Sequence, residues 1–213
     1  MLEDPLPRAS LSKIPRQKRA IATVHSILDA GIRVLEHEGI EGFTSNRVAE
    51  VAGVSPGSLY QYFANKEMVM AGIVERGVLS AERQIRAVTL SAVDLPPSTL
   101  VRQIASALLM SLEPYGALLA EILTATPVLS GTGLAALLET RLGDAVRDFL
   151  LAHPIGYGIR GGRAGLYVMV NGAIFVGLKW LSERPAFVSR EELVECFVAQ
   201  LDTLLVVRPP AAL

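Results

Sequence analysis

Apolar residues recur three and four positions apart along most of the chain, the spacing that places side chains on one face of an α-helix. Alternation of apolar and polar residues, the pattern of a half-buried strand, is not convincing anywhere. Glycine and proline residues interrupt the apolar stripes and mark where helices end. The pattern therefore predicts an all-α fold with helices over residues 16–38, 66–90, 98–112, 114–125, 131–151, 163–183 and 190–207.

Two further short helices are predicted between residues 44 and 63, separated by a tight turn. Thr44 caps the first helix, and Gly53 supplies the positive φ that ends it. Ser55 caps the second helix, and a proline follows at its first position, where a missing N–H costs nothing. Leu59 and Phe63 give this helix a buried stripe, which leaves Ser58, Gln61 and Tyr62 facing outward. The layout is that of a helix-turn-helix, whose second helix enters the major groove of DNA.

Residues 44–67 resemble the N-terminal pattern of the tetracycline-repressor (TetR) family of bacterial transcription regulators. The shared positions run from Thr44 through Ala-Gly-Val-Ser at residues 52–55 and Leu-Tyr at residues 59–60 to Lys-Glu at residues 66–67. The resemblance implies a three-helix DNA-binding head followed by a helical body that binds ligand and dimerises. The expected domains are a flexible basic arm (1–15), the head (16–65) and the body (66–213).

Carried over by position, the resemblance implies which residues meet DNA. Thr44 and Ser55 would bind phosphates at helix N-termini, and Tyr60, Tyr62 and Lys66 would also hold the backbone. Gly57 would allow close approach, while Ser58 and Gln61 are the candidates for base edges, since Gln pairs with adenine in bidentate fashion. Pro56 stands where many relatives carry a longer, often basic side chain. It is either an apolar contact or only a helix-starting proline.

The formal net charge is only −1, but basic residues concentrate at the N-terminus. Residues 8–19 contain no acid and carry Arg8, Lys13, Arg16, Lys18 and Arg19. Such an arm suits phosphates or a minor groove, although a solvated tail has the same composition. We expect Arg16 and Lys18 to belong to the DNA contact.

The last two long helices are the expected dimer surface. Small residues in 163–183 would let a neighbouring helix approach, and the final helix adds apolar area; alternatively, these faces fill a monomer core. In the TetR family such helices form an intersubunit four-helix bundle, and a two-fold dimer reads a near-palindromic operator. The small residues are Gly165, Gly172, Ala173 and Gly177, with apolar Leu166, Val170, Phe175 and Leu178 beside them, and the final helix carries Leu193, Val194, Phe197, Leu201, Leu204 and Leu205.

The resemblance also implies an effector pocket in the body, one that accepts a small apolar or aromatic molecule. Each candidate could equally be a core residue, because aromatic and methionine side chains at helical spacing usually are. Asn171 is the expected polar anchor. The other candidate lining residues are Met110, Tyr115, Leu119, Phe149, Tyr167, Met169, Phe175 and Trp180.

Other features narrow the function. Hydrophobic residues make up 51% of the chain, generous for one subunit, yet no uninterrupted apolar run reaches a membrane span. The single cysteine, Cys196, excludes an internal disulfide, fits the cytoplasm and is expected to be a small buried residue. Glycines at 156, 158 and 161 match a dinucleotide fingerprint without its βαβ context and are read as a flexible loop. We expect no cofactor, no metal site and no catalysis.

Three function classes remain. A dimeric repressor released by a ligand uses the head, the arm and the body together. A transcriptional activator or partner-controlled regulator has the same sequence features, because the sign of regulation depends on where the operator lies. An all-α enzyme with an accessory head is more distant, since no nucleophile signature is present.

Overall fold

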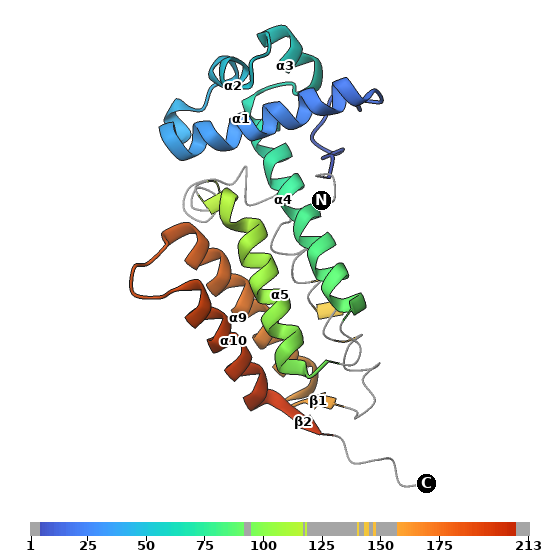
Figure 1. Cartoon of the computed structure of the whole chain (residues 1–213), viewed down its shortest axis with the longest axis vertical. Helices are drawn as coiled ribbons and strands as arrows, with labels where there is room; N and C mark the ends of the chain where they lie inside the picture. Colours follow the sequence, from blue (N-terminus) through green and yellow to red (C-terminus); the bar gives the residue numbers. More distant parts are fainter. Residues whose placement is uncertain are drawn as a thin grey trace. The chain divides into compact units, whose positions relative to one another are not determined.

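The computed structural model describes residues 5–91, 95–116, 118, 140, 143–144, 147 and 157–207. These residues are mainly helical, which confirms the predicted all-α fold. The chain divides into two compact units, Met1–Ser80 with Glu113–Leu134 and Ala81–Leu112 with Ala135–Leu213. Figure 1 shows α4 (Lys66–Ser91) as one long helix. The division falls within this helix, after Ser80.

The first unit is built around three helices that precede α4. These are α1 (Lys18–Gly42), α2 (Ser45–Ala52) and α3 (Pro56–Tyr62). Helix α1 is longer than predicted, but Gly39, at φ 67°, interrupts its helical backbone where the sequence indicated a stop. Gly31 lets α1 lie close to α4, because a Cβ there would be 2.8 Å from Ile73 Cδ1. The fully buried core of this unit includes Ile27, Leu28, Phe43, Leu59, Phe63 and Ile73.

One charged side chain is buried in this core. Arg76 of α4 is 2% exposed, and its Nη1 lies 2.7 Å from Asp29 Oδ1 of α1. A buried guanidinium needs a carboxylate close by, so the pair fixes α4 against α1.

The second unit contains α5 (Pro97–Leu112), α9 (Gly162–Glu183) and α10 (Arg190–Leu204), which lie side by side (Figure 1). Their apolar stripes meet: Leu109, Leu178 and Leu201 are all buried. The predicted bounds 66–90, 98–112 and 163–183 agree with the structure to within one residue. The helix predicted over 131–151 lies almost entirely outside the described residues. The helix predicted over 114–125 is described only at residues 114–116 and 118, and its start overlaps a 3-10 turn (η1, Glu113–Tyr115).

Two short strands were not predicted. Strand β1 (Tyr157–Ile159) pairs antiparallel with β2 (Leu205–Val207), in the register Gly158 to Val206. The predictions of a loop at 157–159 and of a helix continuing to 207 were therefore wrong. The run Leu-Leu-Val-Val at 204–207 continues the apolar stripe but ends in β-branched residues, which favour extended backbone once a partner strand is present.

Helix α9 is the most apolar described element. By length and composition it could cross a membrane, with a mean hydropathy of 1.4 over 18 residues, of which 33% are buried. In the structure it contacts α5 and α10 instead of standing alone. Its exposed large apolar residues are Tyr167, Val168, Phe175 and Val176, which are 44–63% exposed.

Candidate nucleic-acid interface and apolar cavity

Helix α2 begins and ends as the sequence predicts. Thr44 Oγ1 accepts a hydrogen bond from Arg47 N–H at 3.1 Å, and Gly53 adopts φ 68° and ψ 30° at the other end. Val48 and Ala49 are fully buried against the rest of the head. The two caps and this buried face hold α2 firmly enough to orient the helix that follows the turn.

Helix α3 is seven residues long and is capped by Ser55, whose Oγ accepts from Ser58 N–H at 3.1 Å. The two serine hydroxyls also lie 2.9 Å apart. Pro56 occupies the first helical position, as predicted, and Leu59 is fully buried. Tyr60 is 50% exposed and Gln61 is exposed, so their side chains are available to a ligand on this face.

Tyr62 does not face outward as predicted. Its side chain is only 8% exposed, because residues 59, 62 and 63 share one face of α3 and that face packs on the head. Spacing of three and four residues already links Leu59, Tyr62 and Phe63, so the sequence contained this signal. Tyr62 thus contributes mainly to the core, and the outward residues of α3 are half-buried Ser58 with exposed Tyr60 and Gln61.

Helix α4 has its own N-terminal cap beside the recognition helix. Asn65 Oδ1 accepts from Met68 N–H at 2.8 Å, which places Lys66 at the first helical position. Arg47, on the preceding helix α2, forms ion pairs with Glu38 at 2.8 Å and Glu50 at 2.9 Å. Hydrogen bonds to Glu50 and Glu38 raise the pKa of Arg47, so its charge is used inside the head.

The five basic residues of the N-terminal stretch 8–19, called here the basic cluster, differ from Arg47 in having no acidic partner among the described residues. Its members are exposed, and none forms an ion pair with an acid in the part of the chain that the structure describes. Positive charges left without an internal partner are suited to an external anion. The members are Arg8, Lys13, Arg16, Lys18 and Arg19.

The arm itself, expected to be flexible, lies against the head over residues 9–12. Ser12 N–H donates to Tyr62 O at 2.8 Å, and Ser10 is 3% exposed. Ala9 N–H and Ser10 N–H donate to the carboxylate of Glu75 on α4 at 2.9 and 3.0 Å. Sequence reasoning did not single out Glu75, because its partners lie more than sixty residues away.

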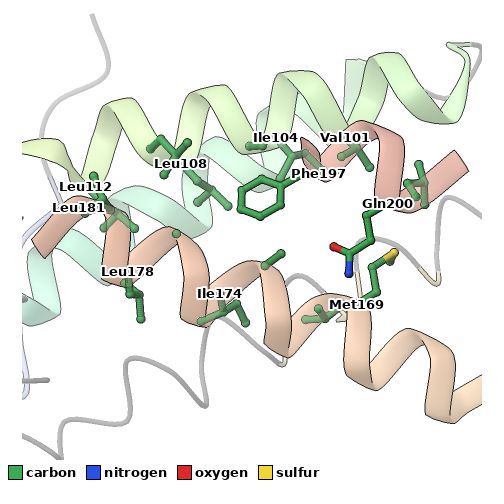
Figure 2. A pocket seen from close by; sticks show the side chains of 16 residues that line it. Val101, Ile104, Leu108, Leu112, Met169, Ile174, Leu178, Leu181, Phe197 and Gln200 are labelled. Carbon is green, nitrogen blue, oxygen red and sulfur yellow. The ribbon is translucent and has the colours of Figure 1, made fainter. Parts of the chain in front are cut away.

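An apolar cavity of about 110 Å³ lies in the second unit between α5, α9 and α10. All of its lining side chains are apolar except Gln200, whose amide Figure 2 shows among carbon-only side chains and the sulfur of Met169. Ile104, Leu108 and Phe197 are among the lining residues that sequence reasoning did not propose as a pocket. Such a wall accepts an apolar molecule with at most one hydrogen-bonding group.

Of the proposed pocket residues, Met169 lines this cavity. Met110, Tyr167 and Phe175 are 58%, 61% and 60% exposed, away from it. Leu119 and Phe149 lie outside the described residues.

The remaining three candidates have other local partners. Tyr115 packs beside Gly77 in the first unit: a Cβ added at Gly77 would lie 3.4 Å from the ring of Tyr115. Asn171 Nδ2 donates to Tyr167 O, and Trp180 Nε1 donates to Val188 O at 2.9 Å. Within the described part of the body, Gln200 takes the place expected for Asn171 as the polar group of the cavity.

The proposed dimer residues divide between two faces. Val170, Leu178, Leu193, Val194 and Leu201 are buried within the unit, and Ala173, Gly177 and Phe197 line the cavity. Gly172 and Phe175 face open space instead, since nothing lies within 4 Å of a Cβ added at Gly172 and Phe175 is 60% exposed. Cys196 is exposed, contrary to prediction, because the buried stripe of α10 runs through residues 194, 198 and 201.

Comparison with known proteins agrees with this geometry. Residues 27–73 match the sequence model of the bacterial regulatory proteins of the tetR family. No curated protein matches the sequence. Solved structures share the fold: the fatty acid degradation regulator FadR from Bacillus halodurans is 16% identical, with a TM-score of 0.62 over 88% of this chain and 96% of that one.

Two further structures are similar. A TetR-family transcriptional regulator from Mesorhizobium loti is 17% identical, with a TM-score of 0.64 over 88% of this chain and 96% of that one. SmeT in complex with triclosan is 19% identical, with a TM-score of 0.62 over 90% of this chain and 95% of that one. The helix-turn-helix and the family match together define residues 27–73 as the DNA-binding region of a tetR-family bacterial regulatory protein, and the solved structures share the fold of the chain.

Proposed function

We propose that this regulator is a dimeric repressor that binds a near-palindromic operator and is released by a small apolar or aromatic ligand. The observation that carries DNA recognition is the outward face of α3. It is polar and uncharged, suited to base edges, and cations that pair with no described acid lie on the arm and at the start of α1. Base contacts then specify the site while phosphate contacts supply affinity.

Selection of random duplex DNA on the purified full-length protein, followed by sequencing, tests this proposal. We expect an inverted repeat with half-sites roughly 34–36 Å apart, one turn of DNA. Recovery of sequences no different from the input library would contradict sequence-specific binding.

A dimer is supported by the exposed apolar stripe of α9. Tyr167, Val168, Phe175 and Val176 form it, and Gly172 leaves room for a second helix to approach. Contiguous apolar surface of this kind is rarely left to solvent in a monomer. Burial between two copies accounts for the hydropathy of α9 without a membrane. The protein would then act in the cytoplasm, where its operator lies.

The apolar cavity supports control by a ligand. Its walls come from α5, α9 and α10, so an occupant would change how these helices pack in the unit that begins within α4. Differential affinity for two arrangements is what allows a ligand to shift DNA binding. The SmeT structure contains triclosan, a small aromatic compound, and a molecule of similar apolar character suits the cavity here.

A series of alkyl and aromatic compounds of increasing size, added to the protein–operator complex, tests the ligand. We expect release by the compounds that fit, and loss of this response in Ala173→Leu, which fills the cavity. Ala199→Leu on the exposed face of α10 is the matched control and should respond as the wild type does. Equal release from both variants would place the ligand elsewhere.

An activator or a partner-controlled regulator would bind the same operator. The position of the recovered operator relative to a promoter, combined with transcription in the presence and absence of the protein, separates activation from repression. An enzyme with an accessory head would instead tolerate Tyr60→Ala and Lys66→Ala without loss of its function.

A further inference from the structure

The N-terminal arm lies in a seat that the head provides. On one side the Glu75 carboxylate accepts three hydrogen bonds, from Ala9 N–H, Ser10 N–H and Ser10 Oγ, at 2.9–3.0 Å. On the other, the last carbonyl of the recognition helix, Tyr62 O, accepts from Ser12 N–H at 2.8 Å. Both anchors belong to the first unit.

The floor of this seat requires a residue without a side chain. A Cβ at Gly72 of α4 would lie 3.0 Å from Ser10 Oγ, 2.9 Å from Phe63 Cε1 and 3.1 Å from Leu28 Cδ2. Gly72 is buried in the middle of a helix, where glycine is otherwise unfavourable, and its presence is explained by the close passage of Phe63, Ser10 and Leu28 together. The glycine leaves room for Ser10 beside the core residues, and the hydrogen bonds to Glu75 hold Ser10 in that space.

The seat leaves the charges of the arm outside. Ser10 is 3% exposed, whereas Arg8 and Lys13 on either side of it are exposed and form no ion pair with any described acid. Holding residues 9–12 therefore holds the backbone that carries both cations, next to the end of α3. A fixed cation binds a phosphate without first having to be ordered.

We propose that Glu75 is a positioning residue for DNA binding: it touches no DNA, but seats the arm so that Arg8 and Lys13 meet phosphates beside the recognition helix. The inference rests on the proposed DNA-binding function. An acid on a DNA-binding head ordinarily weakens binding by repulsion. Glu75 has the opposite effect, because the geometry it imposes on two cations outweighs its own charge.

The direction in which one substitution changes the affinity for DNA tests this proposal. Glu75→Gln removes a negative charge, so electrostatics alone predicts equal or tighter binding to DNA. Our proposal predicts weaker binding, by roughly tenfold, since ordering each of two long side chains anew costs a factor of about 2 to 12. Gln keeps one oxygen but places an NH2 group against an N–H donor, so at least one anchor of the arm is removed.

The measurement is the affinity of the full chain for the duplex recovered by selection, across a range of salt concentrations. Glu36→Gln is the matched control, because Glu36 is an exposed acid of the same unit with no hydrogen bond or ion pair to a described residue, and it should bind as tightly as the wild type or more so. In Glu75→Gln the slope of log affinity against log salt should fall by about 0.9 for each phosphate that the arm no longer neutralises.

Deletion of residues 1–12 separates an effect through the arm from a general one. If Glu75 acts through the arm, adding Glu75→Gln to the deletion should weaken binding no further. Ser10→Leu, which is neutral and too large for the space above Gly72, should weaken binding as Glu75→Gln does, with α4 unaltered. Thermal unfolding of each variant confirms that the head is intact.

Wild-type binding by Glu75→Gln and Ser10→Leu, or an equal weakening in the deleted background, would overturn the role of Glu75 and leave the proposed function standing. Absence of wild-type binding to any duplex would overturn both.

Discussion

Gly53 and Gly57 lie four residues apart in the helix-turn-helix, but the backbone requires glycine only at the first. Gly53 has φ 68°, in the left-handed region, with open space around it. Gly57 lies within α3, and the nearest atom to a Cβ placed there, Ser55 Oγ, is 3.9 Å away. Among the described residues nothing excludes a side chain at Gly57, and we propose close approach to DNA as the reason for this glycine.

The two alanine substitutions should therefore behave oppositely. Gly53→Ala should lower the free energy of unfolding by about 1–2 kcal/mol, the cost of a left-handed non-glycine residue. Gly57→Ala should raise it by up to about 1 kcal/mol, because glycine is a poor helix residue, yet weaken operator binding. Denaturant unfolding and duplex titration measure both. Full operator affinity in Gly57→Ala would show that α3 does not approach the DNA at this position.

Tyr60 and Tyr62 form a second contrasting pair on α3. Tyr60→Ala should change the unfolding free energy by less than about 0.5 kcal/mol, as at other exposed positions, while operator affinity falls at least tenfold. Tyr62→Ala empties a buried site and should destabilise the head by about 3 kcal/mol. The same two measurements distinguish them. A stability loss in Tyr60→Ala as large as in Tyr62→Ala would contradict the orientation of α3.

At the scale of elements, α10 shows how short-range interactions define a helix start. Ser189 and Glu192 form a complete capping box: Ser189 Oγ accepts from Glu192 N–H at 3.2 Å, and Glu192 Oε2 accepts from Ser189 N–H at 2.8 Å. The hydrogen bonds from the Ser189 backbone and side chain lower the pKa of Glu192. The carboxylate form thus favours the folded helix.

This capping box predicts a pH dependence. Because the pKa of Glu192 is lowered on folding, its contribution is complete above its unfolded pKa, about 4.3, and is lost as pH falls through the folded value. Ser189→Ala should cost about 1 kcal/mol near pH 7. Glu192→Gln should flatten the acid limb of stability against pH, measured by thermal unfolding. An acid limb identical to that of the wild type would rule out this contribution.

Element boundaries were predictable where the determinants are local. Thr44, Gly53, Ser55 and Pro56 act within four residues of themselves, and the structure has each helix end where they place it. Strand β2 was not predictable in this way. Its partner, β1, lies almost fifty residues earlier, and the apolar run at 204–207 suits a helix equally well until that partner is known.

At the scale of the whole molecule, the exposed stripe of α9 determines the expected assembly. Phe175→Lys places a charge at the centre of this stripe and should convert a dimer to monomers, because an unpaired charge in an apolar interface is costly to bury. Light scattering during size-exclusion chromatography, without detergent, measures the mass. Arg163→Ala is the control, because Arg163 is exposed in the first turn of α9, and this variant should stay dimeric. Lys179→Glu would be a poor control, since it also breaks the ion pair with Glu183. A wild-type monomer would contradict the proposed interface.

The sequence by itself determined the class of this protein. Helical spacing, two capped helices and the glycine between them are local features, and each acts through hydrogen bonds and packing within about one turn of helix. These features, together with the family pattern at 44–67, were enough for the all-α fold and the DNA-binding head.

Only the tertiary structure decided which partner covers each apolar or polar face. Periodicity shows that a face is buried, but not whether by the same subunit, as at Val170 and Leu178, or by nothing described in this chain, as at Phe175. It likewise could not connect Ser10 to Glu75, since their contact depends on the path of the whole head. Contacts between residues distant in sequence arise from packing, which no local pattern encodes.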